Sequence, residues 1–104
     1  MTPEDFTESV RRRLIHCEFV LVPKGQEYSR GGDRLHNFKK AAAIEKCTPE
    51  KALLGMAMKH IVSIMDMVDD LPDLPGQNTQ DEKFTDAINY LLLLEALIEE
   101  RRRA

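Results

Sequence analysis

Cysteine, glycine, proline and aromatic residues are scarce in this chain of 104 residues, which contains 2 Cys, 5 Gly, 5 Pro and no Trp. Cys17 and Cys47 lack the paired spacing of a zinc site, and two thiols are too few for a disulfide scaffold. Glycine and proline are also too few for a low-complexity chain. These absences predict a single folded domain over residues 1–104 with two reduced cysteines.

Long apolar runs and a strong net charge are missing as well. The longest apolar stretch, residues 88–94, is interrupted by Asn89 and Tyr90 and is far shorter than the roughly 20 residues that cross a bilayer. No basic segment followed by an apolar one opens the chain, so we expect no secretion signal. The net charge is −3, whereas proteins that bind nucleic-acid duplexes are usually basic. We expect a cytoplasmic protein without a membrane or nucleic-acid partner.

Helix-forming residues make up most of what is present. Leu, Ala, Ile, Met, Glu, Lys and Arg dominate, which favours helix over strand. Apolar residues at helical spacing predict four segments, over about residues 2–22, 33–46, 48–70 and 79 to the end. Short connections between such segments are typical of a bundle. The expected fold class is therefore all-α, a compact bundle of about four helices.

Capping signals set the expected ends of these helices. Pro23 and Gly25 are expected to end the first segment, and Asp33 is expected to cap the second. Thr48-Pro49-Glu50 is a good start signal for the third segment. The fourth opens with Thr79-Gln80-Asp81-Glu82, which matches a capping box.

The third segment is apolar around much of its circumference. Such a helix is usually buried on most sides, so we expect it at the centre of the bundle. A monomer of this size covers such a helix with difficulty, which predicts a homo-oligomer, a dimer or larger.

Acidic residues at the start of the fourth segment are candidates for metal binding. Glu82, Asp86 and Asn89 are spaced so that all three groups share one helical face. Two carboxylates and an amide at this spacing suit Mg²⁺, which prefers oxygen ligands. Two other interpretations remain open: Glu82 is used in the capping box, or Asp86 pairs with Lys83 or with a residue of another helix.

Two further features combine charge with an unusual position. The stretch from Pro23 to Gly32 contains three glycines, two cations, a carboxylate and a phenol, which is more than a plain connection needs. Lys59 interrupts the apolar third segment near its middle. Its ammonium must reach solvent, pair with a carboxylate such as Glu27, Asp33 or Asp86, or contribute to a phosphate pocket.

Four groups of residues together resemble a family of small phage and prophage proteins. They are residues 24–29, residues 33–38, Lys59 and residues 86–90, and the resemblance spans about residues 10–100. That family is similar in layout to the all-α MazG-like nucleoside triphosphate pyrophosphohydrolases. The shared features are a Lys/Glu-Tyr turn after the first helix, a third helix with a lysine, and an Asp-x-x-Asn-Tyr helix. Lys83 stands where those enzymes have the Glu of a Glu-x-x-Asp motif.

The resemblance implies a protein that handles a nucleotide or another phosphorylated small molecule, with Mg²⁺-dependent pyrophosphohydrolysis as the reaction if it is an enzyme. Catalytic roles would fall to Glu27, Lys59 and Asp86, and Mg²⁺ would be held by Glu82 and Asp86. The ligand-binding residues would be Lys24, Tyr28, Asp33, Arg34, Asn37, Asn89 and Tyr90. The alternative is a non-catalytic phage helical module that binds a host or phage protein.

Overall fold

Four helices form in the part of the chain that the structure, a computed structural model, describes. That part comprises residues 1–28 and 30–104, without the side chains of residues 24–28. The helices are α1 (Pro3–Tyr28), α2 (His36–Glu45), α3 (Pro49–Asp69) and α4 (Gln77–Arg103), and the described residues form no sheet. The predicted all-α bundle of four helices is confirmed.

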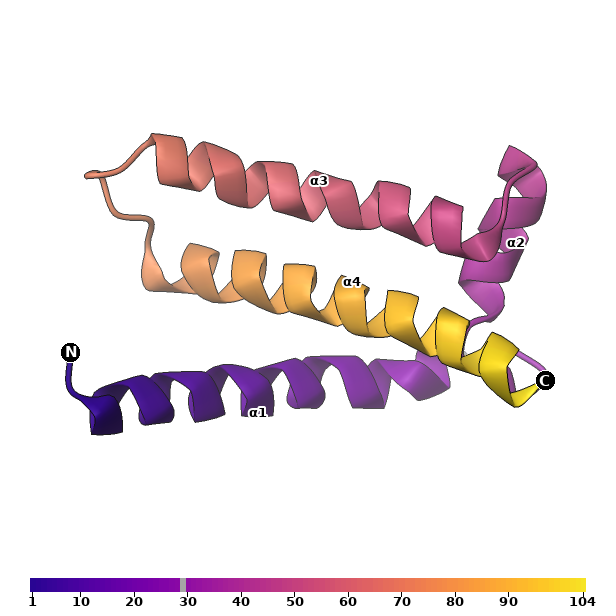
Figure 1. The fold of residues 1–104 in the computed structure, drawn as a ribbon, viewed down its shortest axis with the longest axis horizontal. Coiled ribbons are helices and arrows are strands. Elements are labelled where there is room, and N and C mark those ends of the chain that lie inside the picture. Colours follow the sequence, from indigo (N-terminus) through magenta and orange to yellow (C-terminus); the bar gives the residue numbers. More distant parts are fainter. Residues whose placement is uncertain (29) are drawn as a thin grey trace.

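The three long helices lie side by side, with α4 between α1 and α3, and α2 crosses one end of α3 (Figure 1). α1 runs parallel to α4, and α3 runs antiparallel to it. The molecule measures 44 × 27 × 24 Å. The chain therefore forms a layer of three long helices that is closed at one end by α2.

The prediction that the third helix is central is wrong, because α4 occupies that position (Figure 1). α3 packs against α4 and α2, and one of its stripes stays uncovered. This stripe consists of Leu54, Met58, Val62, Met65 and Val68, each about half exposed. An apolar circumference shows that a helix has surface to bury, but the neighbours available in the fold decide how much of it is buried.

The apolar core lies where α2, α3 and α4 meet. Leu35, Leu53 and Leu97 form its buried centre, and Leu53 has no exposed surface. Phe38 and Tyr90 are among the half-buried side chains that pack against it. This core joins α2, α3 and α4 at one end of the layer.

The predicted end of the first helix at Pro23 is wrong, because α1 continues through Pro23 to Tyr28. Proline lacks the N–H that would donate to the carbonyl four residues earlier, that of Phe19. Phe19 is 75% exposed, so water can replace the missing donor at that carbonyl. One lost backbone hydrogen bond on the solvent side does not end a helix of this length.

The predicted capping box at Thr79 and Glu82 is also wrong. α4 begins two residues before Thr79, at Gln77, and its N-cap is Gly76, whose backbone is extended and which makes no side-chain capping bond. The amide of Gln80 donates to the Gly76 carbonyl at 3.0 Å. Glu82 is therefore not used in a cap, and its side chain is exposed.

The start of α3 agrees with its sequence signal, whereas the start of α2 differs. Thr48 is the N-cap of α3, and its hydroxyl accepts a hydrogen bond from the Lys51 amide at 3.2 Å. The N-cap of α2 is Leu35 rather than Asp33. Asp33 stands two residues earlier and accepts the Leu35 amide at 2.9 Å, so it stabilises the turn before the helix. Gly31 in that turn has a φ of 59°, a conformation that glycine adopts without strain because it has no Cβ atom.

Candidate ligand-binding cleft

A cleft of about 430 Å³ lies where the C-terminal part of α1 and the start of α2 meet the middle of α3 and of α4. Its volume is typical of small-molecule sites, which measure about 300–1,000 Å³. Apolar side chains from three helices form part of its wall, and polar groups converge on it from four segments. The polar lining residues are Arg34, Asn37, His60, Asp86, Asn89 and Tyr90. Five of these six, all but His60, are residues that the sequence predicted for a site.

α4 supplies three of these groups because of their spacing. Asp86, Asn89 and Tyr90 are three and four residues apart, so an α-helix places them on one face. The same face continues one turn later with Leu93, which also lines the cleft. Of the three residues predicted to share a face, Asp86 and Asn89 line the cleft, whereas Glu82 lines a neighbouring pocket.

An aromatic pair forms one wall of the cleft. The rings of His60 and Tyr90 have their centroids 4.5 Å apart and are inclined by 31°. The Nδ1 atom of His60 lies 4.0 Å from the Oδ2 atom of Asp86. His60 was not among the predicted site residues. It lies one helical turn after the core residue Ala57, and nothing in this spacing distinguishes it from an ordinary half-buried histidine. The pair presents flat π surface beside a carboxylate, which suits a planar ligand that carries N–H donors.

Asn89 lies at the floor of the cleft and is buried. Its Nδ2 atom donates to the Cys17 carbonyl at 3.3 Å. Its Oδ1 atom is inaccessible to water and accepts no hydrogen bond within the described part of the chain. An unpaired buried polar atom costs about 1–3 kcal/mol, so this acceptor lowers the stability of the fold.

Arg34 supplies positive charge to the cleft. The guanidinium is half-buried, and one of its nitrogens lies 3.5 Å from the Leu21 carbonyl, to which it donates. This long contact holds the side chain at the end of α1. Asn37 stands one turn away on α2, exposed to solvent. A guanidinium presents its donors in a planar fork, which suits a phosphate or carboxylate group.

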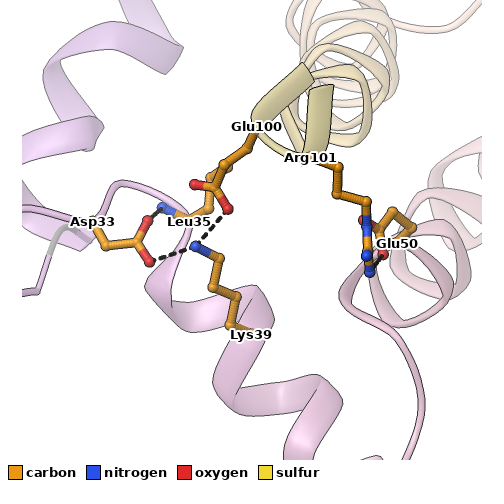
Figure 2. Close-up of polar contacts among 6 residues, drawn as sticks. All are labelled: Asp33, Leu35, Lys39, Glu50, Glu100 and Arg101. Carbon is orange, nitrogen blue, oxygen red and sulfur yellow. Dashed lines mark hydrogen bonds and ion pairs between the residues drawn. The ribbon is translucent and has the colours of Figure 1, made fainter. Parts of the chain in front are cut away.

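Three predicted site residues with described side chains lie outside the cleft, namely Asp33, Lys59 and Glu82. Lys59 is exposed and does not line it. Asp33 is bound to Lys39, whose Nζ atom lies 2.8 Å from Asp33 and 2.7 Å from Glu100 (Figure 2). The hydrogen bond from Lys39 lowers the pKa of the Asp33 carboxyl, and the Leu35 amide adds to this effect. Asp33 therefore fixes the Lys39 side chain, which links α2 to Glu100 at the end of α4, and this is a structural role.

Three other predicted residues, Lys24, Glu27 and Tyr28, have side chains that lie outside the described part of the structure. Their predicted roles stay predictions. The backbone places all three in the last turns of α1, at the end of the helix that also contributes Val20 and Leu21 to the cleft.

The predicted Mg²⁺ ligands Glu82 and Asp86 share a second, smaller pocket with Lys83, adjoining the cleft at Asp86 and His60. Lys83 donates to Ser63 rather than to Asp86, with its Nζ atom 3.3 Å from the Ser63 carbonyl oxygen. Within the described residues, no three His, Cys, Asp or Glu side chains are arranged to hold a metal ion. Two carboxylates beside an ammonium do not fit a Mg²⁺ site by themselves.

A polar interface between α1 and α4 was not predicted. Arg13 donates to the Thr85 hydroxyl at 2.9 Å and to the Asp81 carboxylate. Thr85 is buried, as is Cys17, the thiol of which has its pKa raised by burial. The hydrogen bond from Arg13 lowers the pKa of the Asp81 carboxyl, and one from Gln77 adds to it. Arg13 and Cys17 are four residues apart, so their spacing contained a signal for a shared face.

None of the helices in the described part of the chain is both long enough and apolar enough to cross a membrane. No protein-family model matches the chain, and neither a curated protein nor a solved structure gives a significant match to it. The protein is thus an all-α bundle with a polar cleft that is walled in part by aromatic rings.

Proposed function

We propose that this protein binds a nucleotide, or a similar phosphorylated aromatic molecule, in the cleft between α1, α2, α3 and α4. The observation that carries this proposal is the convergence of Arg34, Asn37, Asp86, Asn89 and Tyr90 on one cleft. These residues come from two stretches of sequence about fifty residues apart. They combine the chemistry that a nucleotide needs.

Each part of such a ligand has a matching group. Arg34 binds a phosphate oxygen, since guanidinium–phosphate hydrogen bonds are charge-assisted. The rings of His60 and Tyr90 offer a surface for the base. Asp86 accepts hydrogen bonds from N–H groups of the base edge. We expect this activity in the cytoplasm, that of the host cell if the protein is phage-encoded.

Mg²⁺-dependent pyrophosphohydrolysis is the catalytic form of this proposal. It is supported by the resemblance to MazG-like enzymes and by the position of Asp86 at the junction of the two pockets. The described side chains do not complete a metal site, so nucleotide binding is proposed without a metal-dependent step. Hydrolysis is measured as a separate readout.

Thermal unfolding with a panel of nucleotides, with and without Mg²⁺, tests the proposal. A nucleotide present at one hundred times its Kd stabilises the folded state by about 2.7 kcal/mol, which raises Tm. Asn37→Ala and Arg34→Ala should remove most of this increase. Lys40→Ala, a change of an exposed cation on the same helix, should preserve it.

Two outcomes bear on the proposal in different ways. An increase in Tm that Mg²⁺ enhances, together with release of pyrophosphate that Asp86→Asn abolishes, would support the catalytic form. The absence of any nucleotide-dependent shift in the folded wild-type protein would contradict nucleotide binding. Lys59→Ala should leave the nucleotide-dependent increase in Tm unchanged, because the Lys59 side chain does not line the cleft.

The second candidate is a non-catalytic helical module that binds a host or phage protein. Uncovered apolar side chains on α3 and α4 favour it, because such surface is usually covered by a partner. It predicts no nucleotide-dependent change in Tm. A helical partner protein that raises Tm in a purified mixture would support this candidate.

A further inference from the structure

α4 has two exposed faces of opposite character. One face lines the cleft through Asp86, Asn89 and Tyr90. The opposite face, which we call the apolar face of α4, follows steps of four and three residues along the helix. It consists of Phe84, Ile88, Leu91, Leu92 and Ile98. The last three are 49%, 44% and 48% exposed.

α1 extends this apolar face sideways. Val10 and Leu14 line a groove of about 580 Å³ together with Phe84 and Ile88. Val10 is 42% and Leu14 is 56% exposed. The apolar residues of the two helices therefore adjoin in this groove, which charged residues such as Glu8 and Arg12 also line.

The total surface of the chain exceeds the average for a folded monomer of its mass. The chain exposes 7826 Å² at 11.9 kDa, whereas monomers of that mass expose about 6,000 Å². The excess is about 1,900 Å² per chain, and obligate homodimers bury about 1,000–2,500 Å² per partner. The radius of gyration, 15.8 Å, also exceeds the roughly 13 Å of a monomeric domain of this length.

The apolar face of α4 is suited to pairing with its own copy. Phe84 and Ile98 lie seven residues on either side of Leu91. A two-fold axis at Leu91, with the two α4 helices antiparallel, therefore sets Phe84 of each chain against Ile98 of the other. Glu95 interrupts the apolar face, but the two copies of Glu95 would lie about 12 Å apart along the helices, so they would not face each other.

Charges at the two ends of the face complement each other in this arrangement. Arg102 lies eleven residues after Leu91, and Gln80 lies eleven residues before it. Gln80 shares its groove with Asp5 and Glu8. The antiparallel pairing thus brings the Arg102 guanidinium, which is 76% exposed, to the carboxylates of the other chain.

We propose that a second copy of this chain covers the apolar face of α4, in an antiparallel two-fold dimer centred on Leu91. The cleft lies on the opposite face of the same helix, so both clefts of the dimer stay open to ligands. This proposal does not depend on nucleotide binding.

Sedimentation velocity over a dilution series tests the dimer, with circular dichroism as the check of folding. Wild type should sediment as a dimer, and Leu91→Glu should raise the dimer dissociation constant on the order of a hundredfold or more, since it sets two carboxylates at the axis. Leu91→Gln, which adds no charge, should weaken the dimer while the helices stay folded. Ile44→Glu makes the matched change at a 74% exposed position of α2 and should leave the dimer intact.

A charge exchange tests the antiparallel geometry. Arg102→Glu should weaken the dimer about two- to fivefold, and adding Glu8→Arg to it should restore the affinity. Failure of this rescue would refute the antiparallel register. A wild-type chain that is monomeric throughout the dilution series would overturn the proposal, and binding of that monomer to lipid vesicles or to another protein would assign the face to that occupant.

Discussion

α4 meets α3 and α2 around an apolar core, with polar pairs such as Arg101–Glu50 and Lys83–Ser63 outside it, but its buried contact with α1 is made by hydrogen-bonded side chains. On the first side, Leu53 and Leu97 are packed with Leu35 in a core without charge. On the second side, Arg13 joins Asp81 and Thr85 of α4. Apolar contact gains free energy in proportion to the area removed from water, whereas the polar contact depends on each donor finding its acceptor.

This difference explains why α1 is the more exposed of the outer helices. Its side toward α4 is occupied by polar groups, with Cys17 as its one fully buried residue among those described. Phe6, Ile15 and Phe19 of the same helix are all more than 60% exposed. The polar interface fixes how α1 is aligned along α4, and the apolar interface supplies most of the burial.

Truncation of the core should give the largest effect. We expect Leu53→Ala to lower the free energy of unfolding by about 2–5 kcal/mol, because it leaves a cavity among fully buried side chains. Urea denaturation measures this loss. Leu54→Ala, the same change at the neighbouring, 47% exposed position, should cost about 0.5 kcal/mol. Equal costs at both positions would contradict the location of the core.

Removal of one hydroxyl should have a smaller effect on the polar side. Thr85→Val keeps the shape of the side chain but removes the acceptor that Arg13 uses at 2.9 Å. We expect a loss of about 1–3 kcal/mol in urea denaturation. Thr79→Val makes the same change at an exposed position of α4. If both variants cost the same, the hydrogen bond does not stabilise this interface.

The smallest effect concerns pH, and on the α1 side of α4 it comes from Asp81. The pKa of the folded Asp81 carboxyl is lowered by its hydrogen bond from Arg13. Its contribution to stability is therefore complete above its unfolded pKa of about 3.9 and is lost as pH falls through the lower folded value. Asp81→Asn should flatten the decline in stability below about pH 5.

Two comparisons make the pH prediction specific. Asp73→Asn, a change in the exposed connection between α3 and α4, should leave the wild-type pH dependence in place. Asp33 and Glu50 also have lowered pKa values, caused first by Lys39 and Arg101 respectively. They contribute equally to wild type and to Asp81→Asn, so the difference between the two curves isolates Asp81. Identical curves would contradict the Arg13–Asp81 interaction.

Much of the candidate site was predictable wherever its residues lie close in sequence. Asp86 and Asn89 were predicted to share a face because the period of the helix determines it, and both line the cleft. Arg34 and Asn37 were selected through a resemblance, and their meeting with α4 depends on how α2 packs. Lys59 was selected because it interrupts an apolar helix, yet its position in the fold lets its ammonium reach water.

The sequence by itself determined the helical class, the number of helices and the start of α3 at Thr48, since helix spacing and capping act over a few residues. Only the tertiary structure decided that α4 is central, that α1 continues through Pro23, and that Asp33 bonds to Lys39 instead of lining the cleft. These outcomes depend on which surfaces find a neighbour and which backbone groups reach water. Both are set by packing between residues that are far apart in the chain.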